Sequence, residues 1–160
     1  MNTTKVLMQD GWKFHLGECE EAWYRGFDDT KWRSVMVPHD WSVELPMEKT
    51  NSSGTGYVAG GIGWYRLHFK LPEAYRGKRV RIVFDGVYKN SQVWCNSYHL
   101  GKRPFGYATF SYDITDFIDF GEVENEISVK VTHTDLADSR WFTGSGIYRK
   151  VMIRVEGYTG

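Results

Sequence analysis

The sequence predicts an all-β protein, an antiparallel β-sandwich with jelly-roll topology. Apolar and polar residues alternate with period two along several segments, helical periodicity is nearly absent, and 17 glycines supply tight turns between the segments. Parallel strands need helical crossovers, and no helix long enough for one is predicted. We expect residues 1–160 to form one domain, because single domains of about 100–150 residues are common.

Five strands are predicted from alternation. In residues 77–86, Val80, Ile82 and Phe84 fall on one face while Arg79 and Arg81 fall on the other, the pattern of a half-buried strand. The other four alternating segments are residues 64–71, 92–96, 127–131 and 147–155. Further strands are expected at residues 31–37, 107–114 and 12–16.

The connections are also partly predicted. Residues 71–78 begin with Leu71-Pro72 and reach Gly77 before Lys78, which favours one helical turn between strands. Residues 42–63 form the longest irregular stretch, and loops of that length are usually functional or disordered. In residues 64–71, Arg66 and His68 are expected on the polar face of a strand.

Charge and targeting signals exclude several classes of partner. The chain has 20 basic and 20 acidic residues, and no basic stripe of the kind that nucleic-acid binding requires. We therefore expect no nucleic-acid partner. The amino end lacks a signal-peptide pattern and no run approaches about 18 apolar residues, so we expect no membrane partner and a cytoplasmic location.

Cysteine and histidine give no sign of a metal site. Cys19 and Cys95 are far apart without a C-x-x-C motif, and the five histidines lack a ligand spacing such as H-x-x-x-H. Cys95 alternates with Val93, which predicts a buried thiol. We expect no cofactor and no disulfide.

Four stretches, taken together, resemble one known domain family. They are VPHDWSVE (residues 37–44), GGIGWYRLHF (60–69), FDGVYKNSQVWCNSYHLGKRPFGYATFSYDIT (84–115) and SRWFTGSGIYRKV (139–151). In this order, over residues 11–156, they resemble the amino-terminal sugar-binding domain of glycoside hydrolase family 2. That family contains β-galactosidases, β-glucuronidases and β-mannosidases, and the PHDWS and RWFTGSGIYR forms are most similar to the β-galactosidase branch.

The resemblance implies a galactose-binding-domain-like jelly roll at the front of a longer, multidomain glycosidase, followed by an immunoglobulin-like domain and a TIM barrel. The catalytic glutamates of the family lie in the barrel, so we assign no catalytic residue to this chain and expect the fragment to be inactive. The parent enzyme is expected to hydrolyse terminal β-galactosides by double displacement. This domain would supply one wall of the pocket.

The candidate substrate-binding residues lie mainly in one glycine-rich stretch. Sugars present apolar C–H faces that pack on aromatic rings and hydroxyl groups that pair with fixed charges, so Asp138, Arg140 and Trp141 form a sensible set. The resemblance implies an acidic residue here that holds the terminal sugar, and either Asp138 or Ser139 takes that place. The alternative is that Trp141 and Phe142 bury the domain interface and that Arg140 pairs with an acidic residue of the barrel.

Two further candidates come from the long irregular stretch. The resemblance places that stretch near the same site, which makes Tyr57 a secondary substrate-binding candidate. Asp40, in PHDW, is also a candidate, although a role in fixing the loop through backbone hydrogen bonds is favoured for it. Trp94 lies within a predicted strand, and core packing is expected for it.

Other acidic residues have simpler interpretations. Asn125-Glu126 copies the Asn-Glu pair that carries the family's acid/base, but it enters an alternating strand, so we interpret Glu126 as a turn-edge residue. We expect Asp28-Asp29 to face solvent in a turn. A second acidic group is expected to cap a short turn, and its members are Asp113, Asp116 and Asp119.

Three functions remain open at this stage. The first is the domain of a β-galactosidase-like enzyme, with a β-glucuronidase or β-mannosidase as variants. The second is an autonomous carbohydrate-binding module, and the third a structural docking domain; fold alone does not decide among them. The expected partners are a β-galactoside or another carbohydrate and the downstream domains of the same enzyme. The resemblance implies that a sodium or magnesium ion could serve the intact enzyme, but no complete ligand set appears here.

Overall fold

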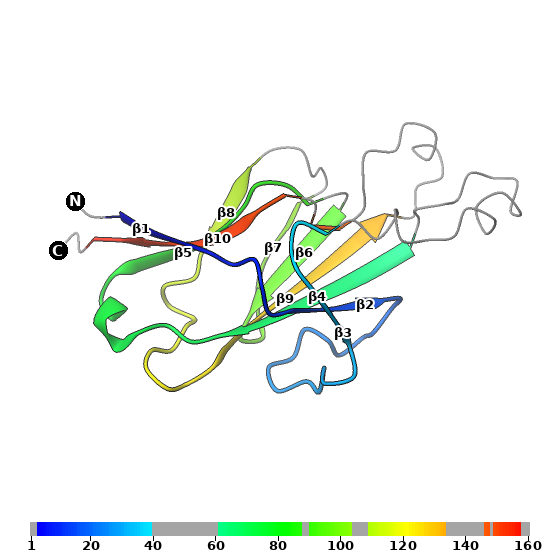
Figure 1. Cartoon of the computed structure of the whole chain (residues 1–160), viewed down its shortest axis with the longest axis horizontal. Coiled ribbons are helices and arrows are strands. Elements are labelled where there is room, and N and C mark those ends of the chain that lie inside the picture. The colour runs from blue at the N-terminus through cyan, green and yellow to red at the C-terminus, as the bar shows by residue number, and fades with distance from the viewer. Residues whose placement is uncertain are drawn as a thin grey trace, which may run out of the picture.

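The computed structural model describes residues 3–39, 61–87, 90–103, 109–133, 146–147 and 149–157. These residues form two packed antiparallel sheets (Figure 1). The strands are β1 (Thr3–Leu7), β2 (Trp12–Leu16), β3 (Arg33–Val35), β4 (Gly61–Phe69), β5 (Arg79–Phe84), β6 (Asn90–Cys95), β7 (Tyr98–Arg103), β8 (Phe110–Asp113), β9 (Asn125–His133) and β10 (Val151–Glu156). A short 3₁₀ turn, η2 (Glu73–Tyr75), connects β4 to β5.

The strand order crosses between the sheets, as a jelly roll requires. One sheet has the order β1-β10-β5-β8, and the other has the order β3-β2-β4-β9-β6-β7. Every pairing between described strands is antiparallel. The predicted fold class, an antiparallel β-sandwich of jelly-roll type, is confirmed.

All five alternating segments contain strands, but some bounds differ from the prediction. The last strand begins at Val151 rather than Ile147, because the Ile147 carbonyl accepts a hydrogen bond from His39 N instead of joining the ladder. The predicted 42–63 loop ends earlier, since β4 already begins at Gly61. The helical turn after Pro72 is confirmed as η2.

Two edge strands were not predicted. All five residues of β1 are exposed. Because neither face of Thr3–Leu7 is buried, its sequence does not need to alternate between apolar and polar residues, and it does not. In β7, Tyr98–Arg103 carries Gly101, whose position against the Tyr112 ring leaves no room for a Cβ atom. Both strands are held by ladder hydrogen bonds to one neighbour, and period-two analysis does not detect such strands.

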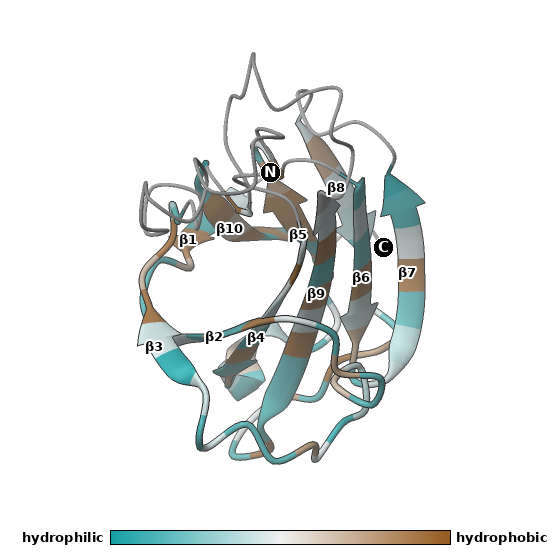
Figure 2. Cartoon of the chain, turned by 90° about the vertical axis from the view of Figure 1, so that its right-hand side faces the viewer, coloured by the Kyte–Doolittle hydropathy of each residue, from teal (hydrophilic) through white to brown (hydrophobic). Residues whose placement is uncertain are grey.

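The core lies between the inner faces of the two sheets. Apolar side chains alternate toward it along β4, β5, β9 and β10, and β9 is banded accordingly in Figure 2. Phe84 stacks on Phe110 with ring centroids 5.2 Å apart, and Trp12 meets Tyr65 edge to face at 6.3 Å. Cys95 is buried as predicted, and burial raises the pKa of its thiol to about 12.

Part of the outer face of the six-stranded sheet, around β4 and β9, is covered by residues 22–29. Arg66 points outward from β4, yet its side chain is completely buried beneath this segment. Its guanidinium forms ion pairs with Asp29, at 2.5 Å, and with Glu126. The expectation that Asp29 faces solvent is therefore wrong: it neutralises a buried arginine, whereas Asp28 is exposed and accepts hydrogen bonds from Thr30.

The turns opposite the β4 amino end are tied together by asparagine side chains. Asn125 Oδ1 accepts hydrogen bonds from Asp119 N (2.8 Å) and Asn96 Nδ2 (3.0 Å), while Asn96 Oδ1 accepts one from Glu126 N (2.8 Å). Asp113 accepts hydrogen bonds from the Thr115 backbone and hydroxyl, the capping role expected for it. These bonds satisfy backbone groups that no strand partner reaches.

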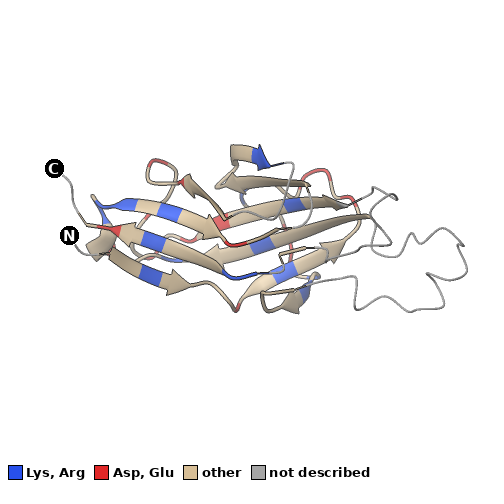
Figure 3. Cartoon of the chain, turned by 90° about the horizontal axis from the view of Figure 1, so that it is seen from above, with Lys and Arg blue, Asp and Glu red and all other residues tan. Residues whose placement is uncertain are grey.

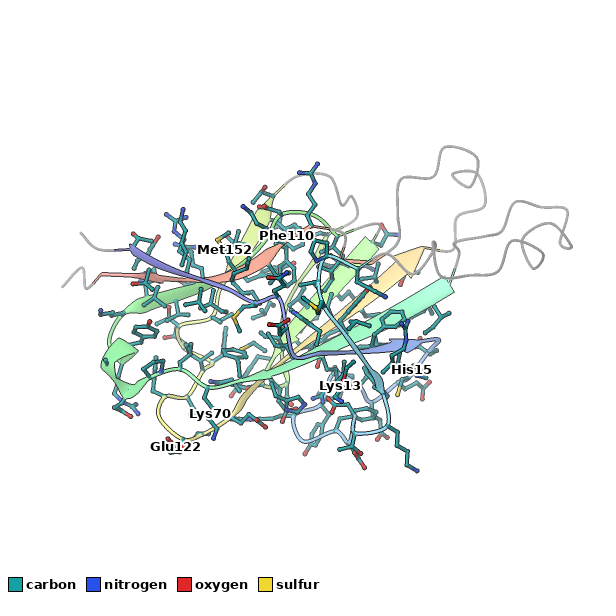
Figure 4. All side chains as sticks on the ribbon, viewed as in Figure 1. Lys13, His15, Lys70, Phe110, Glu122 and Met152 are labelled. Carbon is teal, nitrogen blue, oxygen red and sulfur yellow. The ribbon has the colours of Figure 1, made fainter. Side chains whose placement is uncertain are left out.

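Charge is spread over both sheets. In the view of Figure 3, lysine and arginine lie mainly along the strands, whereas aspartate and glutamate lie mainly in turns and at strand ends. At the surface, Lys70 Nζ lies 3.4 Å from Glu122 (Figure 4). Exposed pairs of this kind contribute little to stability.

Candidate functional site

The internal stretches outside the described residues all start and finish at one end of the sandwich. Strand register shows this for their flanking residues, because Gly61 pairs with His133, Thr132 with Asn90 and Ser91 with Arg103. In the other sheet, Phe84 pairs with both Phe110 and Val151. We call this the loop end; the amino end of β1 and the carboxyl end of β10 lie at the opposite end (Figure 1).

A buried hydrogen bond joins the two candidate segments at the loop end. His39, which precedes Asp40, shares a 2.6 Å hydrogen bond through Nδ1 with the Tyr65 hydroxyl. Its backbone nitrogen donates to Ile147 O at 2.7 Å. The Phe14 ring packs against both partners, 4.7 Å from His39 and 4.9 Å from Tyr65 between centroids. The start of one segment is thus held beside the finish of the other.

Gly146 completes this junction. Its φ of +113° lies in a region that L side chains rarely adopt, and a Cβ atom there would collide with the Tyr65 hydroxyl. It would also lie 3.0 Å from His39 O. Gly146 thus uses the conformational freedom that glycine provides, and Gly144 lies outside the described residues. Sequence reasoning did not identify Tyr65 as the partner, since it has the alternation of an ordinary core residue.

All six substrate-binding candidates lie outside the described residues. They are Asp138, Ser139, Arg140, Trp141, Tyr57 and Asp40. What the structure describes are their flanks: residues 39 and 61 around one stretch, and 133 and 146 around the other. Residues 61 and 133 pair across β4 and β9, and residues 39 and 146 lie together beside Tyr65. The roles of the six residues stay predictions.

The acidic residues within the described part have structural roles. Glu126 is buried, pairs with Arg66 and accepts a hydrogen bond from Gly26 N at 3.0 Å. It is therefore a buried anchor rather than the turn-edge residue expected. Asp29 also contacts His68, whose Nε2 lies 2.7 Å away. Burial raises the pKa of Asp29, but His68 and Arg66 outweigh this and lower it, so the carboxyl stays ionised.

Trp94 is not a core residue, contrary to expectation. Its ring lies on the outer face of the six-stranded sheet, stacked on Trp64 with centroids 5.4 Å apart. Among the described residues, no three histidine, cysteine or acidic side chains are grouped so that they could hold a metal ion. The same residues contain no helix long and apolar enough to cross a membrane.

Comparison with known proteins identifies the family. The model of the glycosyl hydrolases family 2 sugar-binding domain matches residues 8–156. This chain belongs to glycoside hydrolase family 2, as a sugar-binding domain. The resemblance carried by the four sequence stretches is thereby confirmed.

Similar proteins of glycoside hydrolase family 2 include enzymes of more than one specificity. The beta-galactosidase BoGH2A of Bacteroides ovatus is 46% identical over 148 residues, 91% of this chain and 17% of that protein. A beta-glucuronidase of Formosa agariphila is 33% identical, over 89% of this chain and 16% of that protein. A beta-glycosidase structure from Bacteroides vulgatus superposes with a TM-score of 0.85 at 43% identity, covering 95% of this chain and 20% of that one.

The chain therefore spans about one fifth or less of the length of these relatives. Within glycoside hydrolase family 2 it corresponds to the sugar-binding domain. Its described residues form the two sheets and the strand ends that define the loop end. The parent family consists of glycoside hydrolases.

Proposed function

We propose that the chain is the amino-terminal domain of a retaining glycosidase that hydrolyses terminal β-galactosides. Its loop end would form one wall of the sugar pocket. The single observation that carries this proposal is the His39–Tyr65–Gly146 junction, because it brings one flank of each candidate segment together. The specificity follows the relative with 46% identity, which is a beta-galactosidase.

The chemistry needs two carboxyl groups, and the two buried carboxylates among the described residues are both paired with one arginine. Retaining hydrolysis uses two carboxyl groups about 5–5.5 Å apart, one as acid/base and one as nucleophile. Glu126 and Asp29 are instead committed to Arg66. The domain would position the sugar through Arg140, Trp141 and Asp138 or Ser139, with Tyr57 and Asp40 nearby. Catalysis would belong to downstream domains, and the isolated chain would be inactive.

The partners, location and cofactors of the enzyme follow from this assignment. Its partners would be a β-galactoside and the downstream domains of the same protein, in the cytoplasm. No organic cofactor is proposed. A sodium or magnesium ion would be a matter for the intact enzyme, since the described residues offer no metal-binding group.

The test uses the complete enzyme with nitrophenyl β-galactoside and nitrophenyl β-glucuronide. Arg140→Ala and Trp141→Ala should each lower kcat/KM for the galactoside by about ten- to a hundredfold, as for the loss of a binding contact of about 1.4–2.8 kcal/mol. Arg81→Ala, on the outer face of β5, is the control and should retain wild-type kinetics. Unchanged kinetics in both loop variants would remove the loop from the site, and faster glucuronide hydrolysis would overturn the specificity.

A further inference from the structure

A second candidate site lies on the outer face of the six-stranded sheet, two to three residues along its strands from the loop end. It is a pocket of about 350 Å³ between the 18–23 segment and strands β4, β6 and β9. Small-molecule sites commonly occupy about 300–1,000 Å³. Three tryptophans line it, Trp23, Trp64 and Trp94, together with the polar side chains Glu18, Glu20, Gln92 and Lys130. We call it the outer-face pocket.

The wall of the outer-face pocket is fixed by Arg66. Its Nε donates to Ala22 O at 2.9 Å, and its Nη2 donates to Tyr24 O at 3.1 Å. Trp23 lies between these two anchored residues. Ala22 is itself fully buried against the sheet. A buried guanidinium that holds the backbone on both sides of an exposed tryptophan preorganises that ring for contact.

The aromatic floor is also ordered by its neighbours. Trp94 stacks on Trp64 at an interplanar angle of 25° and is flanked on its other side by His99, 5.2 Å away between centroids. Lys130 Nζ lies 5.7 Å from the Trp64 ring centroid. Trp94 is half-buried and Trp23 is 36% exposed, so both rings present apolar surface to the pocket.

Exposed aromatic surface continues beside the outer-face pocket. Tyr24 is 57% exposed and meets Trp23 edge to face at 5.6 Å. A second hollow, of about 330 Å³, is lined by Glu21, Trp23 and Tyr24, and thus shares Trp23 with the first. Because the two hollows share the Trp23 side chain, this ring is available to a ligand in either one. Contiguous exposed aromatic surface of this kind usually marks a binding site.

The polar groups define the chemistry of the ligand. Glu18 accepts hydrogen bonds from Lys130 Nζ at 2.8 Å and from Trp64 Nε1 at 3.2 Å. The Lys130 hydrogen bond lowers the pKa of Glu18, so it is an ionised, fixed acceptor. Glu20 and Gln92 add further hydrogen-bonding groups at the rim. Fixed acceptors and donors beside indole faces match a ligand with hydroxyl groups around an apolar ring.

The charged side chains around the two hollows limit the class of ligand that can bind. The two hollows carry three carboxylates, Glu18, Glu20 and Glu21, against the single ammonium of Lys130. This excess of negative charge disfavours a uronic acid, a phosphate or a nucleic acid. Glutamate and lysine are also depleted from the cores of protein interfaces, which disfavours a docked protein. We infer that the outer-face pocket is an accessory binding site for a neutral oligosaccharide, carried by this domain itself.

The test follows the indole signals of the seven tryptophans by ¹H–¹⁵N NMR in the 160-residue chain. Lactose, a β-linked galactotriose and methyl β-glucuronide are titrated separately. We expect saturable shifts of the Trp23 and Trp94 signals with galactotriose, weaker shifts with lactose, and none with the glucuronide. Trp23→Ala should weaken galactotriose binding by about three- to tenfold, the size of one aromatic contact.

Tyr24→Ala and Tyr98→Ala form a matched pair, since both tyrosines are 57% exposed and Tyr98 stacks on Phe117 away from the pocket. Only Tyr24→Ala should weaken binding. The site is refuted if galactotriose leaves the Trp23 and Trp94 signals in place, or if both tyrosine variants bind equally. Because binding and not hydrolysis is measured, failure here leaves the loop-end proposal standing, and the reverse also holds.

Discussion

The two faces of the six-stranded sheet bury their side chains through different interactions. On the inner face of β9, Ile127, Val129 and Val131 pack into the core without a polar partner to satisfy. On the outer face of the same strand, Glu126 and Ser128 are also buried, but each contacts Arg66 through its side chain. The inner face is held by packing, and the outer face by an ion-pair network under a covering segment.

This difference teaches where the domain can be changed. Apolar packing is non-directional and tolerates substitutions of similar volume. A buried charge needs all of its partners, because removing one leaves the others desolvated and unpaired. The outer face is therefore the more specific of the two, and it also positions the wall of the outer-face pocket.

The largest expected effect is on the outer face. Arg66→Ala removes the shared arginine from two buried carboxylates and should lower the free energy of unfolding by about 3–5 kcal/mol. Urea denaturation followed by tryptophan fluorescence measures it. Arg81→Ala is the control, because Arg81 is partly exposed and lies 3.9 Å from Glu156; its loss should cost less than about 1 kcal/mol. Equal losses in the two variants would remove the distinction between buried and exposed arginines.

A smaller effect is expected on the inner face. Ile127→Val removes one methylene group from the core and should cost about 0.5–1.5 kcal/mol. The loss should be the same at low and high salt, since no charge is involved. Urea titrations at two salt concentrations check this, and a salt-dependent loss would show that the inner face is coupled to the charge network.

The smallest effect concerns pH. The hydrogen bond to Asp29 raises the pKa of His68 above its ordinary value of 6.5, despite burial and Arg66, with Glu126 adding to the rise; Glu124 lies 3.1 Å away. His68 is thus protonated more readily in the folded state than in the unfolded one. Its contribution is complete below pH 6.5 and is lost as pH rises through the raised pKa.

His68→Asn should therefore flatten the decline in stability above pH 6.5. Asp29 acts in the opposite range: its lowered pKa stabilises the fold above its ordinary value of 3.8, and this is lost on acidification. Unfolding free energies measured from pH 5 to pH 9 give the comparison. Ile127→Val should keep the wild-type slope, and a His68→Asn variant with that same slope would contradict the assignment.

Most of the fold could be predicted, because period two reports which side chains share a face. The same pattern says nothing of what covers a polar face. Arg66 and His68 had the sequence pattern of solvent-exposed residues, and only the return of residues 22–29 over β4 buries Arg66. Trp94 was wrongly predicted to lie in the core, because an aromatic residue in a strand can line a pocket on the outer face as well as pack in the core.

The candidate site was predictable in a different sense. The resemblance supplied its residues, whereas the geometry that joins their segments depends on contacts distant in sequence. His39 and Tyr65 are 26 residues apart, and no local pattern marks them as partners. Gly146 is the exception, because glycine in a glycine-rich turn permits the positive φ that the structure shows there.

The junction of His39, Tyr65 and Gly146 has a practical consequence for engineering. Exchanging one loop between relatives in order to change sugar preference would transfer the loop without the residues that hold its ends in place. Any side chain at position 146 would displace the Tyr65 hydroxyl, and with it the backbone of residue 39. A successful graft would have to transplant both loops and their three anchors as one module.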